Sequence, residues 1–284
     1  MGRGLKLEWV FVAGVSSLLV ACDPLLSEAE HGIADGTREI ISNLQRAGHP
    51  SEDISVMASG EVLLEGDMVV STEASRRMAG SSFRHYQFVN NTLSRDIRTI
   101  QVLIDESLER HPDFILFKLA LNGALDEWNE LEGIRFQFEI SSCARTNDPK
   151  FGAIGIRLGG SAHAEGYEQM GHADLPEGGA PGRFVTVTEE LLNTDFKIQQ
   201  MVLMHELGHA VGVAHTDTKT RRSCHQQGEP DTPEHGPGIQ HVDGTAGDGP
   251  VLSVMNACVL GAAELDYTWS SADRVALEKL FGAD

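Results

Sequence analysis

One segment constrains this chain more than any other: Met-His-Glu-Leu-Gly-His-Ala-Val-Gly-Val-Ala-His, which ends at His215. The residues around its start are apolar on most of a helical circumference, so the sequence predicts a buried helix over 195–211. On such a helix, His205 and His209 lie about 40° apart on one face, where two imidazoles can bind one metal ion. Gly212 can take the left-handed conformation that ends a helix, and the chain can then turn to bring in a third imidazole. We therefore expect three histidines around one metal ion.

The residue types in this segment indicate the chemistry of the site. Three neutral imidazoles leave a tetrahedral Zn²⁺ with one open position, which is typical of catalytic zinc and not of closed structural sites. Glu206 flanks the same helix face, where its carboxylate can reach a water held by the metal. The sequence thus predicts one catalytic Zn²⁺, with His205, His209 and His215 as ligands and Glu206 as general base. Three histidines choose weakly among divalent metals, so another ion stays possible.

The segment resembles the zinc motif of the metzincin metallopeptidases, H-E-x-x-H-x-x-G-x-x-H. Those enzymes also have a methionine turn beneath the metal, and Met255 has the corresponding place, forty residues after His215. Within the metzincins, the sequence is most similar to the bacterial dual-action HEIGH metallopeptidases, over roughly residues 60–284. The similarity rests on Met-His-Glu-Leu-Gly-His-Ala-Val-Gly followed by His215-Thr216-Asp217, on Ser253-Val254-Met255, and on Leu64-Glu65-Gly66-Asp67.

This resemblance implies both a fold and a reaction. The fold is α+β, a metzincin-like twisted mixed sheet with a buried active-site helix, a Met-turn and a C-terminal helix. The reaction is hydrolysis of peptide bonds, in which Glu206 takes a proton from a zinc-bound water and delivers it to the leaving amine. Some metzincins have a tyrosine two residues after the turn methionine, where this chain has Ala257. The oxyanion would therefore be stabilised mainly by zinc, or by a donor that the sequence does not identify.

Two other functions stay open. A degenerate peptidase could bind metal in the cell envelope without turnover, although a pure binding site has no need of Glu206 as a general base. A zinc amidase acting on a non-peptide substrate, such as cell-wall material, would carry the same residues. Substrate profiling separates that amidase from an endopeptidase.

Two aspartates are candidates for roles around the metal. Asp67 follows Leu-Glu-Gly, a run similar to the propeptide segment of astacin-like metzincins, in which an aspartate occupies the fourth zinc position. By that analogy, Asp67 would hold the enzyme latent, as a zymogen, until the chain is cleaved within residues 72–95. The alternative is a hairpin turn at Asp67 and the preceding glycine. Asp217 could accept a hydrogen bond from His215 or another ligand, or could cap its own loop.

The N-terminus is typical of an exported protein. Residues 9–20 form an apolar run as long as the core of a signal peptide and too short to span a bilayer. The run ends in Leu-Val-Ala-Cys, which resembles the bacterial lipobox. We expect a signal peptide at 1–21, a lipid anchor on Cys22, and a place in the bacterial cell envelope, on the outer membrane or facing the periplasm. A plain secretory signal cleaved near Ala21 is the alternative and would give a secreted protein.

The mature chain is expected to have two parts: a propeptide-like segment and linker at 22–95 and a catalytic domain at 96–284. The first part should hold a helix near 38–46 and strand residues between 54 and 70, followed by a linker. In the second part we expect strands at 100–104, 134–140, 151–158 and 184–187, helices at 114–128, 195–211 and 271–281, and irregular loops at 159–182 and 216–254. The strand at 184–187 could be an edge strand that pairs with an extended substrate, or an internal strand.

The charge balance limits the partners. Asp and Glu total 42 against 22 Lys and Arg, for a net charge of −20, which argues against binding to nucleic acid. Anionic lipid headgroups would repel such a chain, so a membrane tether must be the lipid itself. The expected partners are a protein or peptide substrate and the membrane, and the chain is expected to be a monomer.

Export would place the remaining cysteines in an oxidising compartment. Cys224 and Cys258 flank one loop region and are the preferred disulfide pair, which leaves Cys143 over.

Further metal sites have weak support. Asp243 and Asp248, with nearby glycines, could bind calcium but match no complete oxygen-ligand loop. His163 and His172 lie in a Gly-rich stretch loosely similar to the structural metal loop of matrixins, and we expect plain loop histidines there.

Overall fold

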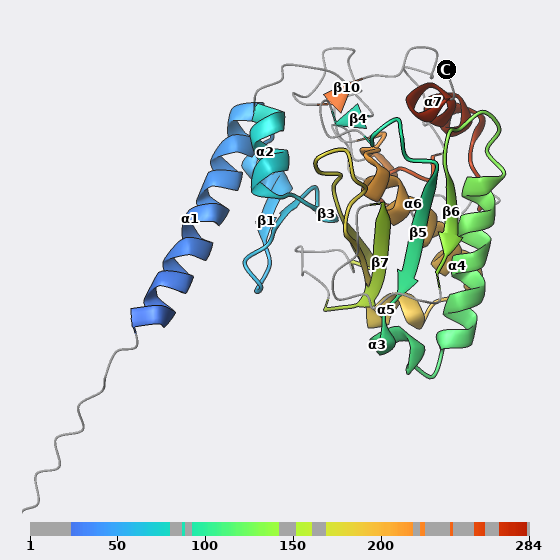
Figure 1. The fold of residues 1–284 in the computed structure, drawn as a ribbon, viewed down its shortest axis with the longest axis horizontal. Coiled ribbons are helices and arrows are strands. Elements are labelled where there is room, and N and C mark those ends of the chain that lie inside the picture. Colours follow the sequence, from blue (N-terminus) through green and yellow to red (C-terminus); the bar gives the residue numbers. More distant parts are fainter. Residues whose placement is uncertain are drawn as a thin grey trace, which may run out of the picture.

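Figure 1 shows the computed structural model, which describes residues 24–79, 87–88, 93–141, 152–160, 169–217, 222–224, 239–240, 253–258 and 267–282. Eight strands form one mixed sheet in the order β1-β2-β3-β8-β9-β7-β5-β6. They are β1 (Ile54–Val56), β2 (Val62–Leu64), β3 (Met68–Val69), β5 (Thr99–Ile104), β6 (Gln137–Ile140), β7 (Ala153–Leu158), β8 (Gly171–Asp174) and β9 (Phe184–Val187). A separate pair joins β4 (Gln87–Phe88) to β10 (Ile239–Gln240). The fold is α+β, as the sequence predicts.

The helices lie around this sheet, with α1 and α2 on one side of the molecule and α4 and α7 on the other (Figure 1). They are α1 (Pro24–Ala47), α2 (Thr72–Ala79), α3 (Glu106–Glu109), α4 (Phe114–Asn129), α5 (Glu189–Leu192), α6 (Phe196–Val211) and α7 (Ser271–Phe281). None of the described helices is both long enough and apolar enough to cross a membrane.

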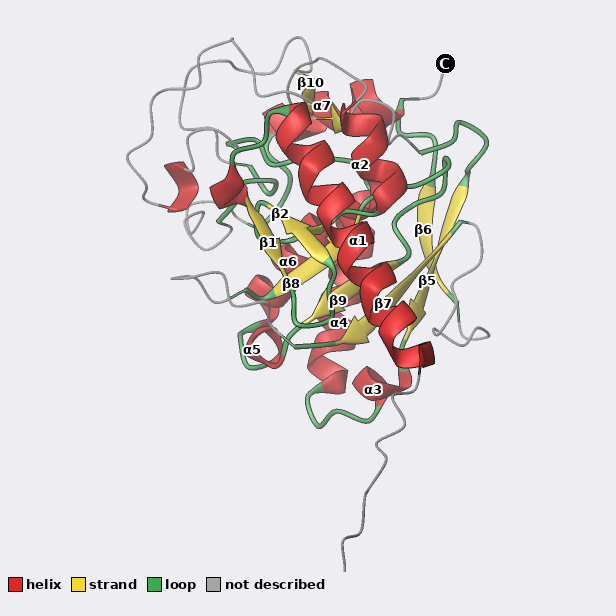
Figure 2. Cartoon of the chain, turned by 90° about the vertical axis from the view of Figure 1, so that its left-hand side faces the viewer, coloured by secondary structure: helices red, strands yellow, loops and turns green. Residues whose placement is uncertain are grey.

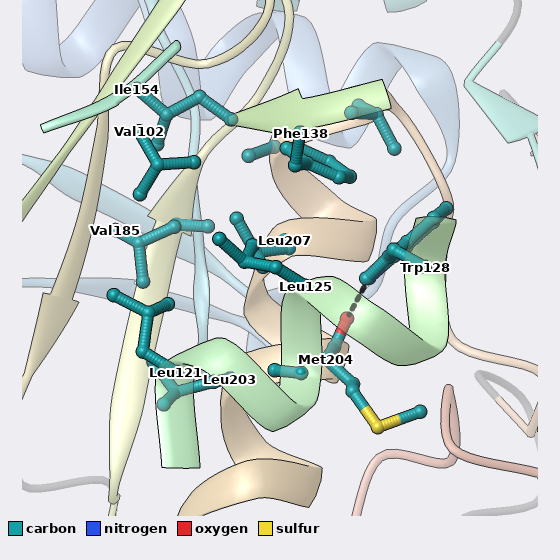
Figure 3. Close-up of a cluster of buried hydrophobic side chains, with 14 of the residues drawn as sticks. Val102, Leu121, Leu125, Trp128, Phe138, Ile154, Val185, Leu203, Met204 and Leu207 are labelled. Atoms are coloured by element: carbon teal, nitrogen blue, oxygen red, sulfur yellow. Dashed lines mark hydrogen bonds between the residues drawn. The ribbon is translucent and has the colours of Figure 1, made fainter. Parts of the chain in front are cut away.

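Helix α6 lies in the main hydrophobic core, where it packs against α4 and against strands of the sheet (Figure 3). The Asp195 side chain accepts hydrogen bonds from the first-turn N–H groups and so fixes the start of the helix. The helix ends at Gly212, whose φ of 103° is left-handed. Leu203 and Leu207 face the core, and the indole of Trp128 on α4 donates a hydrogen bond to the Met204 carbonyl at 3.2 Å. These contacts hold the helix that carries the metal motif.

The N-terminal segment, residues 24–79, has a small hydrophobic core of its own. Ile40 and Leu44 of α1 pack with Met78 of α2, and the two helices lie side by side over the strands (Figure 2). Leu175 and Ala214, from the rest of the chain, also belong to this core. Strand β3 pairs in parallel with β8, so the segment extends the same sheet that α6 packs against. The segment is therefore joined to the rest of the protein by both side chains and backbone.

Several sequence predictions need correction. Helix α1 begins at Pro24 and not near residue 38. Its residues in the smaller core, Ile40, Leu44 and Ala47, lie toward its C-terminal end, so the apolar pattern marks only that end of the helix. Helix α2 lies where a linker was expected. Strand β8 lies within the predicted loop 159–182, and the short β10 lies within the predicted irregular stretch 216–254. Strand β9 lies between β8 and β7, so the prediction of a sheet edge there is wrong and the alternative of an internal strand is right.

The signal peptide at 1–21 and Cys22 lie outside the described residues, as do Cys143, His163, Asp243 and Asp248. The domain boundary at residue 95, the monomeric state and the lack of nucleic-acid binding stay predictions.

Candidate metal centre

The three motif histidines converge at one point. His205 and His209 project from one face of α6, and the left-handed turn at Gly212 brings His215 to the same place. The Nε2 atoms of His205 and His209 lie 2.9 Å apart, and Nε2 of His215 lies 3.2 Å from each of them. All three side chains are buried. The local fold thus places three imidazole nitrogens around one small volume, as the spacing predicts.

The other nitrogen of each ring has an oxygen acceptor. The contacts, at 2.7–2.9 Å, run from His205 Nδ1 to the Val254 carbonyl, from His209 Nδ1 to the Val213 carbonyl, and from His215 Nδ1 to Glu65 Oε2. An Nδ1 that donates a proton leaves a lone pair on Nε2, so the three lone pairs point at one another. Tetrahedral zinc with bonds of 2.0–2.1 Å would separate its nitrogen ligands by about 3.3 Å, close to the observed spacing. The residues therefore fit a Zn²⁺ ion.

Asp67 occupies the fourth side of this cluster. Its Oδ2 lies 2.8 Å from Nε2 of His215 and 3.3 Å from Nε2 of His205. Burial alone would raise the pKa of Asp67, but the neighbouring histidines hold it well below its ordinary value. The carboxylate belongs to the turn between β2 and β3, so the hairpin that the sequence allows is present. A single turn thus forms a hairpin and reaches the metal site.

Glu206 is buried next to the cluster, beside β8. A Cβ built on Gly171 would lie 3.1 Å from Cγ and Oε1 of Glu206, so the strand packs directly on this side chain. Burial raises the pKa of Glu206 well above its ordinary value, and the nearby charge of Asp67 raises it further. Oε2 has no hydrogen-bond partner among the described residues. The carboxyl is therefore held in place by packing, with one oxygen not engaged in a hydrogen bond there.

Met255 lies directly beneath the metal helix. A Cβ added to Gly208 would come within 2.5 Å of the Met255 sulfur, so only glycine permits this approach. The Met255 carbonyl accepts a hydrogen bond from the backbone N–H of Thr216, the residue after the third histidine. The turn is also tied to α7, because Asp273 accepts hydrogen bonds from Ser253 Oγ and the Val254 N–H. Met255 therefore packs against α6 at the place where the resemblance predicts a methionine turn.

Asp217 caps its loop. Its carboxylate accepts hydrogen bonds from the N–H and the hydroxyl of Ser223, at 2.9 and 2.7 Å, and from the N–H of Ala257 at 2.8 Å. The expected disulfide between Cys224 and Cys258 closes the same region. These contacts are those of a loop-capping aspartate, the second of the two roles that the sequence allows for Asp217.

The carboxylate that accepts a hydrogen bond from His215 Nδ1 is Glu65, to which the sequence pattern assigns no role. The signal available was its position, two residues before Asp67.

His172 is not a plain loop residue, as the sequence suggested. It lies on β8, its side chain is buried, and burial lowers its pKa. It is outside the group of four residues that could hold a metal ion.

Residues 62–281 match a protein family described as dual-action HEIGH metallo-peptidase. The chain belongs to that family. In this dual-action HEIGH metallopeptidase, three histidines and one aspartate form a buried group that could hold a metal ion. Two solved structures of myroilysin are similar to it, each at 11% sequence identity and a TM-score of 0.37. One match covers 70% of this chain and 99% of that one, and the other covers 72% and 92%. A comparison with curated proteins gives no match.

Proposed function

We propose that this metallopeptidase is a zinc endopeptidase that is made in a latent form. The observation that carries the proposal is the metal cluster itself: three converging Nε2 atoms, with every Nδ1 facing an oxygen acceptor. The fourth corner is filled by Asp67, from a segment outside the metal helix.

The reaction follows from the residues around this cluster. Bound Zn²⁺ would polarise the scissile carbonyl and lower the pKa of a water molecule. His205, His209 and His215 would hold the ion, and their backbone and side-chain acceptors fix the ring orientations. Glu206 accepts the proton of the attacking water and passes it to the leaving amine. Ala257 stands where some metzincins have a tyrosine, and its backbone N–H donates a hydrogen bond to Asp217, which holds the loop.

The latent state follows from the position of the N-terminal segment. The Asp67 carboxylate stands where the attacking water and the substrate carbonyl must enter. The same turn leads into β3, which bonds along β8: the Ala173 N–H donates to the Asp67 carbonyl at 2.9 Å, and the Leu175 N–H donates to the Val69 carbonyl at 3.2 Å. An extended substrate would use this side of β8 once β3 has left it. Cleavage between residues 79 and 93 followed by departure of the segment would therefore open both sites.

The test is proteolysis of casein by purified residues 23–284, with zinc content measured in parallel. We expect one zinc per chain, little activity in the intact parent, and a large gain after limited cleavage between residues 79 and 93. Glu206→Gln should keep the zinc and stay inactive after the same cleavage. Asp67→Ala should raise the activity of the uncleaved chain.

Two results would contradict the proposal. A cleaved chain that holds zinc and cleaves no protein substrate would remove the endopeptidase function, and assays on cell-wall amides would then test the amidase. An uncleaved parent as active as the cleaved chain would remove the latency.

The export proposal rests on the sequence of residues 1–22 alone. We propose that Cys22 is lipidated and anchors the mature chain in the bacterial envelope. Mass spectrometry of the N-terminal peptide should find an acylated Cys22, and Cys22→Ser should move the protein from the membrane to the soluble fraction. An unmodified N-terminus near residue 22 would favour secretion.

A further inference from the structure

The turn that carries Asp67 contacts His215 at both ring nitrogens. Asp67 Oδ2 lies 2.8 Å from Nε2, and Glu65 Oε2 lies 2.9 Å from Nδ1 of the same imidazole. The two carboxylates are two residues apart and hold the ring from opposite sides. The other two motif histidines have backbone carbonyls as their Nδ1 acceptors. His215 is thus the one motif histidine whose Nδ1 acceptor comes from the N-terminal segment.

The backbone around Glu65 is arranged for this contact. Glu65 has a φ of 56°, and it is one of two non-glycine residues with positive φ in the described part of the chain. Such a conformation is uncommon for a residue with a side chain and is found where surrounding structure imposes it. The Glu65 N–H donates to the Asp53 carbonyl at 2.7 Å, which ties the turn to the start of β1. Gly66, with a φ of 97°, then directs the chain back so that Asp67 reaches the metal site.

The Glu65 side chain is enclosed by protein, and its carboxylate faces His215. Its side chain is fully buried, and a buried carboxylate is costly unless a donor faces it. Carboxylates that receive the distal N–H of a metal-bound imidazole fix the ring and raise its basicity, and their loss weakens metal binding about 10- to 100-fold.

We infer that the N-terminal segment completes the metal centre as well as closing it: Glu65 is a positioning residue that orients His215 as a zinc ligand. Departure of the segment removes this acceptor together with Asp67. The latent chain therefore binds zinc more tightly than the activated chain. Activation opens the site to substrate and at the same time lowers its affinity for zinc. This inference rests on the proposed zinc function of the three histidines.

The experiment is a zinc competition titration against a chromogenic chelator, on uncleaved residues 23–284. Glu65→Gln keeps a neutral acceptor of the same shape, and Glu65→Ala removes the acceptor. We expect the zinc dissociation constant to rise in the order parent, Gln, Ala, with about a 10- to 100-fold increase for Ala. Glu61→Gln, on the same segment, is the matched control, because Glu61 bonds to Ser59 and not to a motif histidine. It should bind zinc as the parent does.

Two further measurements keep the result decisive. The melting temperature of the zinc-free proteins separates positioning from folding: Glu65→Gln should melt close to the zinc-free parent while binding zinc more weakly. The visible spectrum of the Co²⁺-substituted protein should change in Glu65→Gln and not in Glu61→Gln. Zinc binding by both Glu65 variants within about threefold of the parent would overturn the inference. A parent that binds no zinc, or a His215→Ala variant that binds zinc as the parent does, would instead overturn the proposed function.

Discussion

The approach of Met255 to the metal helix depends on a single missing side chain. Gly208 lies inside the motif, between the two helical histidines. A Cβ there would lie 2.5 Å from the Met255 sulfur and 2.9 Å from its terminal methyl carbon, closer than packed atoms approach. The identity of this residue follows from the methionine turn and not from the chemistry of the metal.

Gly208→Ala is expected to destabilise the protein by up to about 2 kcal/mol, because overpacking of about 1–3 kcal/mol is partly offset by the helix preference of alanine, about 0.5–1 kcal/mol. Urea unfolding of the zinc-free protein measures the change. Gly36→Ala is the control: Gly36 lies in α1 with open space around its Cβ position, and the same substitution should stabilise by about 0.5–1 kcal/mol. A Gly208→Ala protein as stable as the parent would show that the turn can move away.

Asp174 on β8 gives a pH-dependent prediction. Burial raises its pKa to about 6, partly offset by the charge of Arg157 and a hydrogen bond from the Phe184 N–H. Between pH about 4 and 6, the Asp174 carboxyl therefore keeps a proton in the folded state that it has lost in the unfolded state. Its contribution to the free energy of unfolding falls as the pH rises through that window, by at most about 3 kcal/mol. The stability of Asp174→Asn relative to the parent should therefore rise over that range and level off above it. Urea melts of the two proteins from pH 4 to 8 test this.

At this scale, the sequence predicts residues whose spacing is itself the signal. His205, His209 and His215 meet because helix geometry and one left-handed glycine bring them together. Glu65 could not be assigned a role in this way, because its partner is 150 residues away and the contact depends on how two separate cores dock.

Among the elements, helix α6 has a side-chain cap at its start. Asp195 Oδ1 accepts hydrogen bonds from the N–H groups of Lys197 at 2.9 Å and Ile198 at 3.1 Å. Helix α4, which packs against α6, has Asp113 as its N-cap residue, but this side chain makes no capping hydrogen bond. The two helices meet in one core, but of the two only α6 has a side-chain cap at its N-terminus.

Asp195→Ala is expected to lower the free energy of unfolding by about 1 kcal/mol, because two first-turn donors lose their acceptor. Asp113→Ala, at the corresponding position of α4, should change it by less than about 0.5 kcal/mol. Thermal or urea melts of both variants give the comparison. Equal losses in the two would mean that general charge near a helix start, and not the cap, is responsible.

Elements with strong internal patterns were predicted well. Both α6 and α7 begin and end close to the predicted residues, because an aspartate or serine cap marks each start. Strand β8 was missed, since Gly-His-Ala-Asp contains no residue typical of strands. It is a strand because β3 and β9 pair with its two sides, which no local pattern reveals.

In the whole molecule, two hydrophobic cores meet at the metal site. The larger core holds α6, and the smaller one holds α1, α2 and the strands that lead to Asp67. The four metal-facing residues come from both parts. Metal binding should therefore stabilise the molecule as a unit.

Removal of the metal is expected to lower the melting temperature of the uncleaved chain. An ion that binds only the folded state stabilises it by about 4 kcal/mol when free zinc is a thousand times the dissociation constant. Calorimetry after chelation, and again after zinc is restored, measures this difference. His209→Ala should melt at the same temperature in both conditions. A parent whose melting temperature ignores zinc would contradict a native metal site.

Because β3 pairs with β8, a chain that has been cut between residues 79 and 93 should behave differently at different protein concentrations. In the intact chain, the segment faces β8 at the effective concentration set by its covalent connection, which for short links is in the millimolar range. After the cut, the same contact becomes an encounter between two molecules. Activity after cleavage should then depend on dilution: a concentrated sample rebinds its own fragment, and a dilute one loses it.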